Sequence, residues 1–217
     1  MRSEEDYPLA VIHIAPQLAF SKAATRFSVP DLLERGVRLH SGSPRPTRPD
    51  MMPGGVESTT DPAPQHGEGG RKISLYENAV VEIITARATY TKTDETIISH
   101  NSLVDSITGN LATVLSLLAE RHQDQNVLVT ATYVGFDGSK LKIDFPTSPV
   151  THNHVQTPVL SFPSHNPENG EDADTYNLRE ERVKELFRPL FHSVDRKDFP
   201  MEIPGSLGLP DLSVDES

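Results

Sequence analysis

The stretch NSLVDSITGNLATVLSLLAERHQ, residues 101–123, carries the clearest periodic pattern in the chain. Its apolar residues recur at alternating steps of three and four, which places them on one stripe of an α-helix. The stripe consists of Val104, Ile107, Leu111, Val114 and Leu118, widened by Leu103 and Leu115. Asn101 or Ser102 is the expected N-cap, and Asp105 falls in the first turn. A helix with so long an apolar stripe needs an apolar surface to cover it.

Strand patterns flank this helix on both sides. Before it, KISLYENAVVEIITARATYTKT (72–93) predicts a strand over 73–76, a turn at Glu77–Asn78 and a long strand over 79–91. After it, YVGFDGSKLKIDF (133–145) predicts a β-hairpin with a two-residue turn at Asp137–Gly138. The side of this hairpin expected to face the helix carries Leu128, Val134, Phe136, Leu141, Ile143 and Phe145. The other side carries Tyr133, Lys140, Lys142 and Asp144.

Proline and glycine separate this block from its surroundings. No proline occurs between His66 and Phe145, whereas twelve of the thirty residues in 41–70 are Pro or Gly. Such a segment buries too little apolar surface to offset the entropy of ordering it, so a disordered linker is expected. Before the linker, LAVIHIA (9–15) predicts a buried strand, and SVPDLLERG predicts a short helix capped by Ser28 and stopped by Gly36.

After the hairpin the prolines return, and a second helix follows them. TYNLREERVKELFRPLFHSV predicts a C-terminal helix with a kink at Pro189, because proline opposes the carbonyl four residues back. The apolar side of this helix carries Val183, Leu186, Phe187, Leu190, Phe191 and Val194.

These patterns together predict an α+β fold. We expect an antiparallel sheet of about four to six strands, packed against the long central helix and the C-terminal helix, with long disordered segments. The expected organisation is a strand and short helix in 1–40 docking on the core, a disordered linker in 41–70, an α+β core in 71–145, a Pro-rich acidic loop in 146–175, the C-terminal helix in 176–196 and a flexible tail in 197–217.

Composition excludes several classes of function. The net charge is −11, and residues 146–217, with 6 basic and 13 acidic groups, account for −7 of it. No segment is basic, so we expect neither nucleic acid nor a membrane surface as a partner. With no cysteine in the chain, thiolate metal sites and cysteine nucleophiles are excluded. No secretory leader or apolar run of membrane-spanning length is visible, so a cytoplasmic or nuclear protein is expected.

Candidate chemistry is sparse. The chain contains no G-x-S-x-G, H-E-x-x-H, Walker-type or G-x-G-x-x-G motif. His152 and His154 have the spacing of two ligands on one strand side, with His165 and Glu168 further on, but their Pro-rich surroundings favour solvated histidines. We therefore expect no metal and no cofactor.

Acid–base groups are harder to exclude. His13 lies in an apolar strand, where a satisfied core histidine is the expectation, and Glu82, Tyr90 and Asp105 lie on elements that can border a cavity. His100 and His122 flank the long helix, where a histidine at the C-terminal end is favoured by the helix dipole.

Two functions are compatible with these features. The first is a non-catalytic subunit or adaptor of an intracellular protein assembly, docking through a sheet edge and the amphipathic C-terminal helix to another chain or to itself. Its expected partner-binding residues are Tyr133, Lys140, Lys142, Phe187 and Phe191. For the lysines, protection of a sheet edge against unwanted pairing is the alternative. The second function is a small cofactor-independent enzyme of the isomerase or cyclase type, or a small-molecule carrier, with a pocket between sheet and helices.

Overall fold

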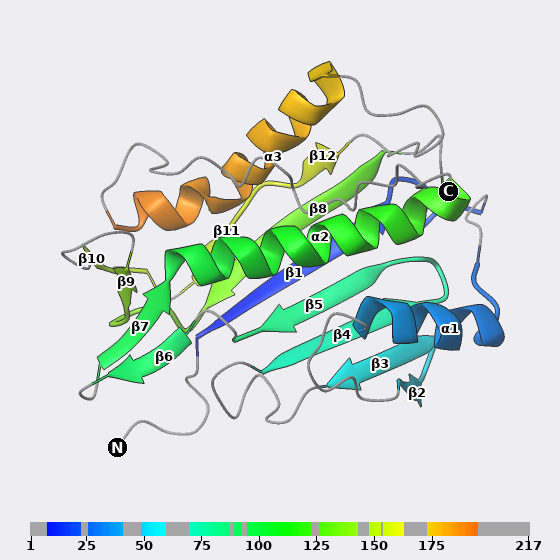
Figure 1. Ribbon diagram of the computed structural model, residues 1–217, viewed down its shortest axis with the longest axis horizontal. Coiled ribbons are helices and arrows are strands. Elements are labelled where there is room, and N and C mark those ends of the chain that lie inside the picture. Colours follow the sequence, from blue (N-terminus) through cyan, green and yellow to red (C-terminus); the bar gives the residue numbers. More distant parts are fainter. Residues whose placement is uncertain are drawn as a thin grey trace, which may run out of the picture.

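The structure is a computed structural model of the chain. It describes residues 8–22, 26–40, 49–59, 70–86, 89–92, 95–122, 126–142, 148–152, 154–162 and 173–194. Three helices and two sheets make up this part of the chain (Figure 1). The helices are α1 (Val29–His40), α2 (His100–His122) and α3 (Ala173–His192).

The larger sheet has eight strands and is antiparallel throughout. Its spatial order is β11 (His154–Gln156), β8 (Val127–Val134), β1 (Leu9–Pro16), β5 (Val81–Thr85), β4 (Arg71–Tyr76), β3 (Gly55–Thr59) and β2 (Asp50–Met52), with β12 (Leu160–Phe162) also pairing with β8. The smaller sheet follows the order β10 (Ser148–Pro149), β9 (Lys140–Lys142), β7 (Glu95–Ser99) and β6 (Thr89–Lys92). The predicted combination of helices with an antiparallel sheet is confirmed, although four to six strands was too few.

Strand β1 lies in the middle of the large sheet, paired with β8 on one side and β5 on the other. Its side chains alternate between the two sides of the sheet, as the period of a strand requires. Ala10, Ile12 and Ile14 are almost fully buried, whereas the residues between them are half-buried or exposed. The sheet therefore has an inner face, to which Ile12 belongs, and an opposite face, to which His13 belongs.

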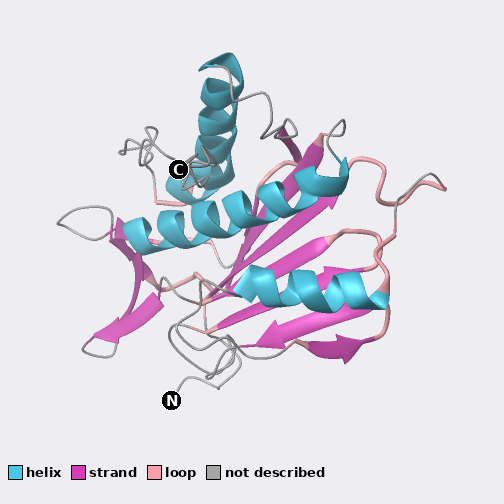
Figure 2. Ribbon diagram, turned by 45° about the vertical axis from the view of Figure 1, so that its right-hand side comes forward, coloured by secondary structure: helices cyan, strands magenta, loops and turns pink. Residues whose placement is uncertain are grey.

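All three helices contact the inner face (Figures 1 and 2). Arg71 of β4 donates from Nη1 to Asn110 Oδ1 of α2 at 2.9 Å, and Tyr133 of β8 donates its hydroxyl to the Leu186 carbonyl of α3 at 2.9 Å. Helix α1 contacts β3 and β4, and its Arg35 donates to the Leu117 carbonyl of α2 at 3.2 Å. Each helix is thus tied to the sheet or to a neighbouring helix by a polar contact as well as by apolar packing.

The apolar stripe predicted for the long helix is buried. Val104, Ile107, Leu111, Val114 and Leu118 are at most 2% exposed. The predicted cap is wrong by two or three residues, because α2 begins at His100 and the Ser99 hydroxyl accepts from the Ser102 N–H at 3.4 Å. A serine immediately before the first helical residue satisfies a donor of the first turn, so the helix starts earlier than the pattern indicated.

Helix α1 begins as predicted and ends later. The Ser28 hydroxyl contacts Asp31 Oδ2 at 2.7 Å, and the backbone N–H of Ser28 donates to the same carboxylate, as in a capping box. The predicted stop at Gly36 is wrong, since the helix continues to His40. A Cβ added at Gly36 would lie 3.1 Å from Pro49 and from Val56, so this glycine permits close helix–sheet packing instead of ending the helix.

The predicted hairpin across Asp137–Gly138 does not form. Strand β8 belongs to the large sheet, whereas β9 lies in the small sheet between β10 and the parallel strand β7. Gly135 has φ 74°, a left-handed conformation that lets the chain leave the large sheet directly after Val134. The predicted long strand over 79–91 is divided in the same way, into β5 of the large sheet and β6 of the small one.

The linker prediction for 41–70 is wrong for residues 50–59, which form the β2–β3 hairpin. Its turn contains Pro53 followed by Gly54 with φ 74°, the residues that a type II turn favours at its two central positions. The proline and glycine that indicated disorder are therefore turn residues here. The other parts of the linker, 41–48 and 60–69, lie outside the described residues, as does the predicted tail 197–217.

The C-terminal part is also more ordered than predicted. Residues 146–175, expected to form a loop, include β10, β11, β12 and the start of α3. Helix α3 spans Ala173–His192 and contains Pro189. It begins three residues before and ends four residues before the predicted bounds of 176 and 196.

Two glycines provide a matched test of this packing. A Cβ at Gly55 would lie 2.3 Å from the Leu75 carbonyl oxygen, whereas a Cβ at Gly109, exposed within α2, meets nothing within 4 Å. We expect Gly55→Ala to lower the free energy of unfolding by about 1–3 kcal/mol, as overpacking does. Gly109→Ala should raise it by about 0.5–1 kcal/mol, because alanine is the better helix former. Denaturant unfolding followed by circular dichroism measures both, and equal effects would contradict the described β3–β4 contact.

Candidate functional site

Three of the five residues predicted to bind a partner lie in the core. Tyr133, Phe187 and Phe191 are at most 1% exposed. Tyr133 lies on the inner face of β8, and its ring centroid is 5.6 Å from that of Phe136. Burial raises the pKa of the Tyr133 hydroxyl, which therefore stays protonated as the donor to Leu186. An anchor for an external partner must be exposed, so Tyr133 does not serve as one in this structure.

Phe187 and Phe191 enclose a buried histidine. The His100 ring lies edge-on to both, with centroid distances of 6.5 Å to Phe187 and 5.0 Å to Phe191. The apolar side of α3 is thereby covered by the start of α2 and by the sheet. It is not available as the docking surface that the amphipathic pattern suggested.

The two lysines of the predicted patch remain near the surface, on an internal strand. Lys140 and Lys142 belong to β9, which has a neighbour on each side, so the prediction of an edge strand is wrong. Lys140 Nζ lies 2.6 Å from Glu95 Oε1 of β7, a pairing that joins the two parallel strands. Leu141 between them is fully buried, as the alternation predicted, while Ile143 and Asp144 lie outside the described residues.

Two of the predicted acid–base residues are brought together by the sheet. His13 of β1 and Glu82 of β5 are directly opposite in the register, and His13 Nε2 lies 2.9 Å from Glu82 Oε2. The expectation of a core histidine is wrong, since the His13 side chain is 46% exposed. Asp105 is exposed on α2, away from this pair, and the side chain of Tyr90 lies outside the described residues.

His152 and His154, two of the histidines considered for a metal, are both exposed. His152 precedes β11 and contacts the Thr151 hydroxyl at 2.9 Å, and His154 is an exposed residue of β11. His165 and Glu168 lie outside the described residues. In the part of the chain that the structure describes, no three His, Cys, Asp or Glu side chains gather in a metal-binding arrangement.

The larger candidate surface is the face of the large sheet opposite the helices, here called the open face. All three described helices lie on the inner side, so within the described residues no helix covers it (Figures 1 and 2). Two neighbouring cross-strand rows make up its centre. The first row contains Thr132, Val11, Ile84, Lys72 and Thr59, and the second contains Thr130, His13, Glu82, Ser74 and Glu57.

Two polar pairs join strands on the open face, which also carries the exposed Asp50 of β2 opposite Glu57. In addition to the His13–Glu82 contact, Lys72 Nζ lies 2.8 Å from Glu57 Oε2, joining β4 to β3. Between these pairs lie apolar side chains, among which Val11 and Ile84 are half-buried and Val134 is 38% exposed. The open face therefore mixes branched apolar side chains with ion pairs, whereas the solvent side of an antiparallel sheet is commonly polar. Sequence analysis missed this surface, although the residues between the buried positions of LAVIHIA and VEIIT mark it.

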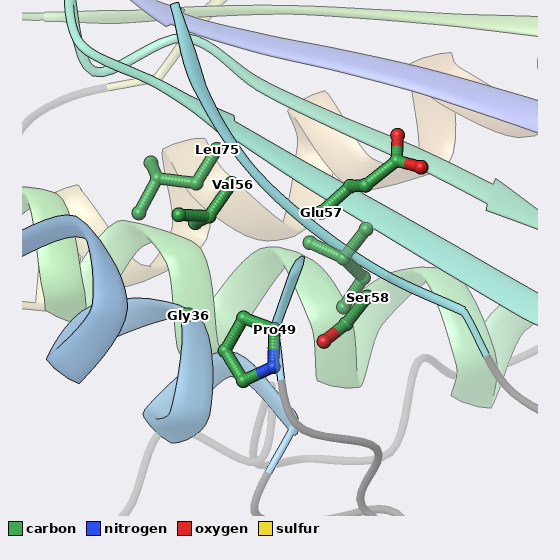
Figure 3. A pocket seen from close by; sticks show the side chains of 7 residues that line it. Gly36, Pro49, Val56, Glu57, Ser58 and Leu75 are labelled. Atoms are coloured by element: carbon green, nitrogen blue, oxygen red, sulfur yellow. The ribbon is translucent and has the colours of Figure 1, made fainter. Parts of the chain in front are cut away.

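A small pocket lies on the other side of the sheet, between α1 and β3–β4 (Figure 3). It is lined by Gly36, Pro49, Val56, Glu57, Ser58, Ile73 and Leu75 and has about 150 Å³ of empty space, part of it open to solvent. Figure 3 shows the Glu57 carboxylate directed away from Val56 and Leu75. Ligand sites for small molecules usually have roughly 300–1,000 Å³, so this pocket is a packing gap rather than a binding site.

A separate apolar feature is the turn after β1. Phe20 is 81% exposed and Leu18 42% exposed, while Ala19 between them is buried. The Gln17 N–H donates to the Asn126 carbonyl at 2.9 Å, which ties this turn to the start of β8.

Comparisons of the chain with protein-family models, curated proteins and solved structures gave no match. In the described part of the chain, no helix has the length and apolar character needed to cross a bilayer.

Removing the Tyr133 hydroxyl tests its role in the core. Because burial raises the pKa of this hydroxyl in the folded state, the unfolded state loses its proton first once the pH exceeds about 10. Wild-type stability should then fall, by up to about 1.4 kcal/mol per pH unit from this residue. Tyr133→Phe should lack the part of this alkaline loss of stability that is due to the Tyr133 hydroxyl. At neutral pH the variant should be less stable than the wild type by about 1–3 kcal/mol, because its hydrogen bond to Leu186 is lost.

Chemical denaturation at neutral and alkaline pH measures this difference. Tyr76→Phe, at a half-buried position of β4, is the matched control for the loss of a tyrosine hydroxyl. Identical alkaline profiles for wild type and Tyr133→Phe would show that this hydroxyl is not buried.

Proposed function

We propose that this chain is a non-catalytic subunit of a protein assembly that binds another protein through the open face of its large sheet. The observation that carries the proposal is the difference between the two faces of one sheet. Three helices cover the inner face, whereas the open face carries half-buried Val11 and Ile84 with no described element over them.

The composition of the open face suits a protein partner. Burial of apolar surface contributes about 25 cal/mol of free energy per Å² removed from water. Branched side chains at the centre of a face therefore stabilise a complex that covers them. The ion pairs His13–Glu82 and Lys72–Glu57 provide a polar pattern that selects among partners. An open face of this kind needs no pocket and no catalytic group to function.

The location proposed here replaces the sheet edge and the C-terminal helix. The apolar side of α3 is buried, and one edge of the large sheet, β2, has only three residues. At the other edge, β11 and β12 are separated by Pro158 and the 64% exposed Val159, an interruption that opposes addition of a further strand. These features favour docking on a face over pairing at an edge.

A second candidate is an acid–base enzyme using the His13–Glu82 pair. A histidine held by a carboxylate at 2.9 Å is the arrangement in which imidazole acts as a general base. Catalysis of this kind normally uses a concave site that excludes water, and the described pocket lies on the inner side of the sheet, lined by other residues. The pair is therefore better supported as part of a binding surface.

Matched Val→Glu substitutions test the docking site. Val11→Glu places a charge at the centre of the open face, and Val29→Glu makes the same change at a 49% exposed position of α1. Each variant and the wild type are used to isolate bound chains from native extract, and each captured chain is then purified and titrated by calorimetry. We expect Val11→Glu to weaken binding at least about tenfold and Val29→Glu to leave it unchanged.

Both variants must first show wild-type circular dichroism and thermal unfolding. A bound chain lost equally from both variants, or from neither, would contradict docking on the open face.

A further inference from the structure

We infer that the open face binds a second copy of this chain, forming a two-fold symmetric face-to-face dimer centred between β1 and β5. This inference rests on the proposed function and names its partner. A symmetric dimer requires a surface that is complementary to itself, so that each group meets its opposite across the axis.

The centre of the open face meets this requirement. Two cross-strand pairs lie side by side there, the apolar pair Val11–Ile84 and the hydrogen-bonded pair His13–Glu82. In each pair one member belongs to β1 and the other to β5. A two-fold axis that runs parallel to the strands, midway between β1 and β5, places β1 of one copy over β5 of the other.

Under this rotation every central residue meets a suitable partner. Val11 faces Ile84 of the other copy, and His13 faces Glu82 of the other copy, each contact occurring twice. The apolar pair is removed from water, and the His13 imidazole meets a carboxylate instead of a second imidazole. The same two pairs also stabilise the pairing of β1 with β5 within one chain, where His13 Nε2 lies 2.9 Å from Glu82 Oε2.

The flanking strands are compatible with the same axis. It places β8 over β4, so that Thr132 faces Lys72, whereas Ser74 is buried within its own chain and the Thr130 hydroxyl donates to the Thr157 carbonyl. No like-charged pair is created in these two rows. Packed sheets are about 10 Å apart and rotated by about 30°, so the closest complementarity is expected at the centre.

Charge exchange between copies tests the axis directly. In H13E the two contacts across the axis join carboxylates, and in E82K they join a histidine and a lysine, so each variant alone should dimerise at least about tenfold more weakly than wild type. When H13E and E82K are mixed, one contact in the mixed dimer joins the introduced carboxylate to the introduced ammonium, and the other joins His13 to Glu82 as in the wild type. The mixture should regain association to within a few-fold of the wild type.

Sedimentation velocity of the full chain, from micromolar to sub-millimolar concentration, measures these equilibria. The ionic strength should be physiological, because repulsion between two chains of net charge −11 is then screened beyond about 8 Å. K140E and E95K, which alter the cross-strand ion pair of the small sheet, are the matched controls and should dimerise as the wild type does.

Recovery on mixing separates a contact between copies from damage within one copy. Each variant also lacks the His13–Glu82 pair inside its own chain, and mixing two folded chains does not restore that pair. A mixture that stays monomeric overturns the inference, as does a wild-type chain that is monomeric at every concentration. If the wild type is monomeric but binds a different protein that Val11→Glu does not bind, the inferred dimer is wrong and the proposed function is supported.

Discussion

The strict alternation of side chains along β1 is the constraint on which the rest of the structure depends. Because β1 is the central strand, its two-residue period sets both sides of the large sheet at once. Ile12 and Ile14 supply the inner side that the helices cover, and Val11 and His13 supply the side that they leave open. A shift of register by one residue would exchange the two sides, so the packed core and the candidate binding surface have a single origin.

The features that sequence predicted well depend on neighbouring residues. The stripe of α2 follows from helical periodicity, and the start of α1 follows from the contacts between Ser28 and Asp31. The features that it missed depend on distant residues. Gly36 was predicted to end helix α1, because its packing against Pro49 and Val56 is not visible in the local sequence. Asp137–Gly138 was predicted to form a hairpin turn, because the pairing of β9 with β7 is not visible there either.

The candidate site shows the same limit. Sequence analysis singled out His13 and Glu82 separately, but their contact depends on the pairing of β1 with β5, far apart in the chain. Tyr133 was placed on an exposed side because its alternation was referred to the wrong partner strand. At Tyr133 the strand pairs with β1 and β11 instead, and the hydroxyl points toward α3. Side-chain alternation thus predicts which residues share a side, while only the pairing decides which side is buried.

The central position of β1 also affects how the chain is made. β1 is synthesised before every other strand of the large sheet, yet β5 follows only after α1 and strands β2, β3 and β4, and β8 follows only after α2 as well. Until then the branched residues of β1 have no sheet to join, and closure of the sheet requires contacts of high sequence separation. Such contacts slow folding, because a long loop must be ordered before any pairing energy is gained. The newly made β1 therefore needs protection from aggregation until β5 and β8 have been synthesised, a demand that a sheet built from sequential hairpins does not make.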